Sequence, residues 1–245
     1  MRHAIVGIAL LGVALATYVD AQPTSYSSSN ARTLVATGAL PTVSAMPLYF
    51  RVIGATIWLG EESGFSPGNG ILYQMTGATE ISASGNIRTI QAGEGMFIPG
   101  GSRLTLKALG NEPSTYLHFL ISSASNLDQP DISPKTGKEI YRSTSPIPAL
   151  KHGRYVLNLS KVTLPANEPF DRPHRRPGAA LHFVLSGFGA ETANGVTVGK
   201  GPGSISYEPG ALVYQWGNPG NPPLTYLVFN LNPESEDAVV AAASD

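Results

Sequence analysis

The chain contains an internal repeat that relates residues 64–119 to residues 174–229 at an offset of 110, without a gap. The matching positions are glycines, prolines and aromatic residues: Pro67 and Pro177, Gly68 and Gly178, Gly77 and Gly187, Gly85 and Gly195, Gly93 and Gly203, Pro99 and Pro209, Tyr116 and Tyr226, and Phe119 and Phe229. A repeat unit on the order of 100 residues has the size of a domain, so the chain is a duplicated fold. A duplication lets one copy keep a functional site while the other only packs.

Each copy consists of short apolar and β-branched runs that alternate with Gly, Pro, Asn and Ser clusters. In the first copy these runs lie at residues 48–59, 71–75, 79–83, 95–99, 103–107 and 114–121. Many short strands with turn signals between them predict an all-β sandwich or barrel. The sequence has no long amphipathic pattern, no phosphate-binding glycine loop before a helix and no Gly-x-Ser-x-Gly elbow.

The repeat and the shifts in composition divide the chain into six segments. We predict a signal peptide (1–21), an N-terminal arm (22–46), a first barrel (47–121), a connector (122–153), a second barrel (154–232) and a C-terminal tail (233–245). The arm is rich in Ser, Thr and Ala, and we expect it to be flexible or to lie as a strand on the first domain.

The first residues have the pattern of a secretory signal. A weakly basic start precedes an apolar run at residues 4–16, and small residues end the segment at Ala21. The run is too short for a comfortable membrane span, so an uncleaved anchor is the weaker alternative. We therefore expect a secreted or periplasmic protein without a membrane span after cleavage.

Composition narrows the classes of partner. The formal net charge is -1, from 16 basic and 17 acidic residues, which does not favour nucleic acid. The chain has no cysteine, which excludes disulfides and thiolate chemistry. We expect a small-molecule partner, and a homo-oligomer remains open.

The repeated residues resemble the two motifs of the cupin family. In that family, His-x-His is followed by Glu and Gly, and a later Gly, Pro-x-Gly, His and Asn form the second motif. The second copy matches with His174, Gly187, Gly203, Pro209 and Asn218. The resemblance covers nearly all of the chain after residue 21, and it implies two tandem double-stranded β-helix barrels, a bicupin.

The residues that bind a metal in the family are mostly absent from this sequence, although the glycine and proline framework is present. The family usually holds a transition metal with three His and one Glu. Those four slots hold His174, Arg176, Ala180 and Tyr214 in the second copy, and Gly64, Ser66, Gly70 and Leu104 in the first. We therefore predict no cofactor, with a transition metal on His174 and His182 as the alternative.

Strand alternation predicts a polar interior in the second barrel. Side chains two residues apart share one face of a strand, so five residues are expected to line one ligand site: His174, Arg176, His182, Tyr214 and Trp216. A guanidinium suits a carboxylate or phosphate, imidazoles exchange protons, and an indole offers a flat wall to a sugar. The structural alternative is that Arg176 pairs with a nearby acid and that both histidines are satisfied structural groups. The first barrel, with Leu72, Leu104 and Leu106 inside, is expected to be structural.

Three functions follow from these residues. The first is a bicupin that binds a small anionic or carbohydrate-like ligand in the second barrel, with little or no metal chemistry. The second is a metal-dependent enzyme with a reduced site, similar to cupin dioxygenases or oxalate-handling enzymes. The third is a metal-free isomerase or lyase with His174 or His182 as the base and Tyr214 as the acid. Fold alone does not choose among them.

Overall fold

The computed structural model describes residues 31–43, 46–83, 85–128, 136–148, 150–210 and 212–242. The predicted signal peptide lies outside these residues. The described chain is all-β, as predicted, with a single short 3-10 helix, η1 (Ala124–Asn126). The strands are β1 (Ala31–Val43), β2 (Leu48–Ile57), β3 (Glu62–Phe65), β4 (Gly70–Thr76), β5 (Ala78–Ala83), β6 (Asn86–Gln91), β7 (Gly95–Ile98), β8 (Leu104–Leu109), β9 (Ser114–Ser123), β10 (Lys138–Arg142), β11 (Gly153–Leu164), β12 (His174–Arg175), β13 (Ala179–Ser186), β14 (Gly189–Ala193), β15 (Val196–Lys200), β16 (Ile205–Glu208), β17 (Tyr214–Gly217), β18 (Leu224–Pro233) and β19 (Val240–Ala241).

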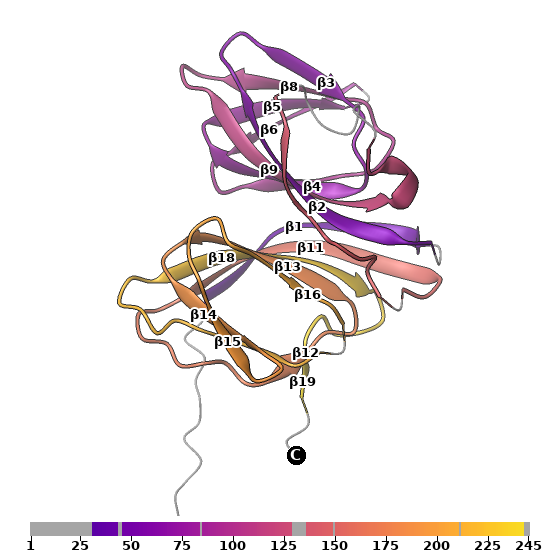
Figure 1. The fold of residues 1–245 in the computed structure, drawn as a ribbon. Coiled ribbons are helices and arrows are strands. Elements are labelled where there is room, and N and C mark those ends of the chain that lie inside the picture. The colour runs from indigo at the N-terminus through magenta and orange to yellow at the C-terminus, as the bar shows by residue number, and fades with distance from the viewer. Residues whose placement is uncertain are drawn as a thin grey trace, which may run out of the picture.

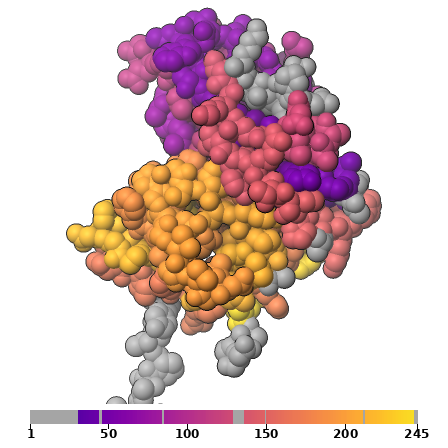
Figure 2. Space-filling view, in the orientation of Figure 1, coloured from indigo at the N-terminus to yellow at the C-terminus, as the bar shows by residue number. Residues whose placement is uncertain are grey.

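The strands form two barrels of two sheets each, one above the other in Figure 1. The first barrel has the strand orders β10-β2-β9-β4-β7 and β3-β8-β5-β6, and the second has β1-β11-β18-β13-β16 and β15-β14-β17-β12-β19. In the space-filling view the two barrels are two lobes in contact (Figure 2). No helix of the described residues is long and apolar enough to cross a membrane.

The 110-residue offset extends to the pairing of individual residues. Leu72 faces His118 between β4 and β9, and His182 faces Val228 between β13 and β18, which is the same pair 110 residues later. The register shift after Gln74 on β4 recurs at the equivalent point on β13. The duplicated sequence therefore encodes a duplicated strand register.

Backbone geometry explains why both copies keep a glycine after this strand. Gly77 and Gly187 have φ angles of 68° and 79°, which side-chain-bearing residues rarely adopt. A Cβ at these positions would also lie 2.8 Å from the Pro113 carbonyl oxygen and 2.3 Å from that of Pro223. Any larger residue would both strain the turn and strike the opposite backbone.

The outer strands of the two barrels are exchanged. The arm before the first barrel supplies a strand to the second barrel, and the connector before the second barrel supplies a strand to the first. β1 of the N-terminal arm pairs antiparallel with β11 of the second barrel, and β10 of the connector pairs with β2 of the first. Residues 31–43 are therefore a strand rather than a flexible arm, and the backbone of this strand pairs with the second barrel and not, as expected, with the first. β1 also packs against the first barrel, because a Cβ at Gly38 would lie 2.1 Å from the ring of Phe97. The arm thus ties the two barrels together.

The facing sheets of the two barrels share one hydrophobic core. It includes Phe50, Phe119, Phe183 and Phe229, whose rings meet at centroid distances such as 5.5 Å for Phe50 and Phe229. Separate cores fill the interiors of the barrels. The first-barrel interior is mainly apolar, as predicted, with Leu72, Leu104 and Leu106 all buried.

Candidate ligand site in the second barrel

The five residues predicted to line one site come together inside the second barrel. His174 on β12 pairs with Tyr214 on β17. Nη2 of Arg176 lies 3.4 Å from Nε2 of His182, and the rings of His182 and Trp216 have centroids 4.8 Å apart. All five side chains are buried. Strand alternation thus placed these side chains in one interior, and their role in binding a ligand stays a prediction.

Glu208, at the end of β16, is the centre of this group and was missed in the sequence. Its Oε2 accepts a hydrogen bond from Nε of Arg176 at 2.6 Å, and its Oε1 accepts one from the indole N–H of Trp216 at 3.1 Å. The repeat held a signal that could have found it, because Glu208 stands 110 residues after Ile98, an apolar residue. A carboxylate in place of a core isoleucine needs a partner inside the barrel.

The charges of this group are balanced within the protein. Burial raises the pKa of Glu208, but the neighbouring His182 and Arg176 outweigh burial and hold it below its usual value. Burial lowers the pKa of His182 to about 3, so its imidazole is neutral at pH 7. A guanidinium only donates, so Nε2 of His182 accepts from Arg176 and its Nδ1 carries the proton, 3.4 Å from Oε1 of Glu208. The geometry of Arg176 is the one expected from the structural alternative, an ion pair with a nearby acid.

Trp216 has a packing role that differs from the expected flat wall. Its ring stacks on Tyr226, with centroids 4.9 Å apart and an interplanar angle of 21°, and only 1% of the residue is exposed. Tyr226 therefore covers the indole face that a sugar would need.

Besides Nδ1 of His182, two buried polar atoms of the same interior have no hydrogen-bond partner among the described residues. They are Oγ of Ser206 and Nδ2 of Asn230. Ser206 faces His182 across the strand pair, and Asn230 faces Ala180, so both point to the barrel interior. Buried polar groups are nearly always paired, with protein, water or ligand. These two groups are therefore free to donate a hydrogen bond to a water molecule or a ligand.

A second guanidinium reaches the second barrel from the N-terminal arm. Arg32 on β1 faces Val162, a residue of the second-barrel core, and directly opposed residues share a face. Arg32 is an exposed residue, and desolvation together with the charge of Arg176 lowers the pKa of its guanidinium. Among the described residues no acid forms an ion pair with Arg32. The sequence pattern does not show that the arm pairs with the second barrel, so Arg32 was not predicted as a site residue.

His174 lies where the loop before β12 covers the barrel. Its Nδ1 lies 3.2 Å from the carbonyl oxygen of Arg172 and 3.7 Å from Oδ2 of Asp171. Burial raises the pKa of Asp171, and the charge of His174 partly offsets this. The loop is three residues longer than in the first copy, since Ile57 to Gly70 spans 13 positions and Leu164 to Ala180 spans 16.

The donor set of this interior does not fit the metal that the cupin family usually holds. The family's four slots carry one imidazole, a guanidinium, a methyl group and a phenol. Of the nearby glutamates, Glu208 is bonded to Arg176 and Trp216, and Glu191 is paired with Lys200. In the described part of the chain no group of three or more His, Asp or Glu residues could hold a metal ion. A guanidinium also repels a cation from the neighbouring imidazoles.

The first-barrel interior also contains a buried histidine. It lies on β9, opposite Leu72, the residue that corresponds to His182 in the repeat. His118 of β9 is fully buried and faces Leu72, and neither ring nitrogen has a hydrogen-bond partner among the described residues. Burial and the charge of Arg51 lower its pKa to about 3.

Because His118 and His182 are neutral in the folded protein, we expect the free energy of unfolding to fall in acid. Unfolding returns each imidazole to a pKa near 6.5, so the unfolded chain binds protons that the folded chain does not bind until about pH 3. Stability is fully present above pH 6.5 and is lost as the pH falls toward 3. Each histidine contributes up to about 1.4 kcal/mol per pH unit. His118→Leu should reduce this slope in urea unfolding measured from pH 7 to 4, and an unchanged slope would contradict the neutral assignment.

Comparison with known proteins identifies the fold. No protein-family model matches the chain, and no curated protein sequence matches it. Oxalate decarboxylase from Bacillus subtilis is similar in structure, with a TM-score of 0.53, 14% identity, and coverage of 87% of this chain and 76% of that protein. Salicylate 1,2-dioxygenase from Pseudaminobacter salicylatoxidans has a TM-score of 0.51, 11% identity, and coverage of 75% and 71%. At such identities the likeness shows the fold alone: the chain has the cupin fold, in a bicupin arrangement.

Proposed function

We propose that this protein is an exported bicupin that binds a small anionic molecule inside its second barrel through direct polar contacts, without a bound metal. One observation supports the proposal most strongly. Ser206 and Asn230 turn buried hydrogen-bond donors toward one interior, and Arg32, an exposed residue of β1, faces Val162 of the same barrel; none of the three groups has a hydrogen-bond or ion-pair partner among the described residues. Several donors that converge without an acceptor suit a ligand rich in acceptor oxygens.

The charges favour a carboxylate over a neutral sugar. The charge of Arg176 is balanced by Glu208, so Arg32 is the cation that remains for a ligand. A guanidinium binds a carboxylate through two parallel hydrogen bonds. Stacking of a sugar on Trp216 is disfavoured because Tyr226 covers the ring.

The signal-like start supports placement outside the cytoplasm, in a secreted or periplasmic form. There the protein would meet small organic acids from the surroundings. N-terminal sequencing of protein from its natural host should find a first residue near Gln22.

A second candidate function, metal-free acid–base catalysis, is favoured by one pair of contacts. His174 lies 3.7 Å from the carboxylate of Asp171, an arrangement that can orient an imidazole base, and Tyr214 is its strand partner. Burial, with the charge of Glu208, raises the pKa of Tyr214, which keeps its phenol protonated as a donor. Turnover of a bound acid that is lost in His174→Gln and Tyr214→Phe would favour this function over simple binding.

Calorimetric titration with small mono- and dicarboxylates, and with neutral sugars of similar size, tests the proposed function. We expect at least one acid to bind, and Arg32→Gln to weaken it by about 10- to 100-fold, the scale of a lost charge-assisted hydrogen bond. Asn230→Leu, which copies Leu120 of the first barrel, should also weaken it. Arg175→Gln, an exposed arginine of β12, serves as the matched control. The proposal fails if no acid binds, or if binding is the same in Arg32→Gln.

A further inference from the structure

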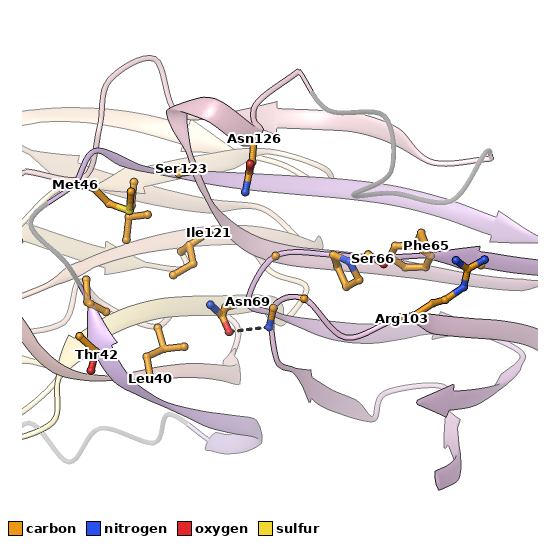
Figure 3. A pocket seen from close by; sticks show the side chains of 17 residues that line it. Leu40, Thr42, Met46, Phe65, Ser66, Asn69, Arg103, Ile121, Ser123 and Asn126 are labelled. Atoms are coloured by element: carbon orange, nitrogen blue, oxygen red, sulfur yellow. Dashed lines mark hydrogen bonds between the residues drawn. The ribbon is translucent and has the colours of Figure 1, made fainter. Parts of the chain in front are cut away.

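We propose that the first barrel carries a separate site for an amphipathic monocarboxylate, in a pocket of about 710 Å³ at its open end. The pocket lies where the end of β1, the turns before β4 and β8, and the end of β9 meet (Figure 3). Its volume is within the range of small-molecule sites, roughly 300–1,000 Å³. It involves none of the residues of the second-barrel site, so it goes beyond the function proposed above.

Arg103 gives the pocket its charge. It is the single ionisable residue in the pocket lining, which contains no Asp or Glu. Its side chain is exposed, and among the described residues it has no ion pair. An unpaired guanidinium in a concave, partly apolar site favours a carboxylate, whose two oxygens match its two parallel N–H groups.

The arrangement of the lining favours an elongated ligand. Figure 3 shows Arg103 beside Phe65 at one end of the pocket, and Leu40 and Met46 at the opposite end. Ile121 lies between them and is buried, as is Leu40. A carboxylate at Arg103 would therefore place an apolar tail along Ile121 toward the arm.

Asn69, between the two ends, supplies a polar contact. Its Oδ1 accepts a hydrogen bond from the backbone N–H of Gly100 at 2.8 Å, which fixes the orientation of the amide. The opposite edge of the amide, Nδ2, then remains as a donor. A ligand with an acceptor near its acid group could use it.

The repeat indicates that these residues are not required by the fold. The positions 110 residues after Arg103 and Asn69 hold Val213 and Ala179, and the same barrel framework forms around them. The charged and amide groups of the pocket are therefore specific to the first copy. The two copies would divide the work, with a small acid in the second barrel and an amphipathic acid in the first.

Titration calorimetry with octanoate, in full-length protein with the signal segment removed, tests this inference. We expect octanoate to bind with one-to-one stoichiometry and octylammonium not to bind. Arg103→Gln should weaken octanoate binding by about 10- to 100-fold. Arg88→Gln, an exposed arginine of β6 outside the pocket lining, should leave it unchanged. Met46→Asp should weaken it as well, because a negative charge would face the apolar tail.

The same titrations separate this site from the second-barrel site. Arg32→Gln should leave octanoate binding intact, and Arg103→Gln should leave binding of the small acid intact. Lack of octanoate binding at millimolar concentration would overturn the inference, as would equal affinity for octylammonium or an unchanged affinity in Arg103→Gln. Because Arg103 is exposed, circular dichroism should show that the variant folds normally.

Discussion

Replacing Glu208 with Ala should lower the free energy of unfolding by about 3–5 kcal/mol, the usual cost of breaking a buried ion pair by removing one partner. The carboxylate is fully buried and accepts hydrogen bonds from Arg176 and Trp216. Without it the guanidinium of Arg176 would be a buried charge lacking its acidic partner, and the indole N–H would lose its acceptor. Urea unfolding at pH 7 measures the effect.

The double variant Arg176→Met, Glu208→Leu distinguishes the loss of charge balance from the loss of packing. It removes both charges, so it should recover much of the stability lost in Glu208→Ala. Glu234→Ala breaks an exposed pair with Arg154 and should change stability little. If Glu208→Ala is as stable as the wild type, the buried ion pair is not formed as described.

Leu104→Ala should cost about 2–5 kcal/mol, because it removes three carbons from a fully buried core position and leaves a cavity. Leu104 packs in the first-barrel core with Leu72 and Leu106, in a slot where the cupin family places a metal ligand. The cost is therefore a measure of how tightly the apolar side chains pack at this position.

Leu34→Ala is the matched control for this variant. Leu34 is 57% exposed, so the same truncation should have a small effect on stability. A thermal unfolding midpoint of Leu104→Ala equal to that of the wild type would show that the first-barrel interior is open rather than packed.

The fold could be predicted from the sequence because its signals are local or repeated. Gly77 and Gly187 mark turns in which only glycine fits, and the ungapped offset carries the strand register from one copy to the other. Arg176 lies one residue after β12 and His182 lies on β13, and their side chains meet in the interior that side-chain alternation predicted.

What could not be predicted depends on pairing between distant segments. The edge strand β1 could hydrogen-bond to either barrel, and its own pattern does not choose, so Arg32 could not be placed. Glu208 was overlooked because the family motif assigns no role to the residue before Pro209. The stacking of Tyr226 on Trp216 could not be predicted either. Tyr226 matches Tyr116 in the repeat, so its pattern indicates only a core residue.

The account rests on a ligand inside the second barrel, and a crystal structure of the protein with the tightest-binding small acid is the most direct test. We predict electron density for the carboxylate beside the guanidinium of Arg32, within hydrogen-bonding distance of Ser206 and Asn230, with Arg176 still bonded to Glu208. A metal ion bound by His174 and His182, or an acid bound only outside the second barrel, would contradict the account.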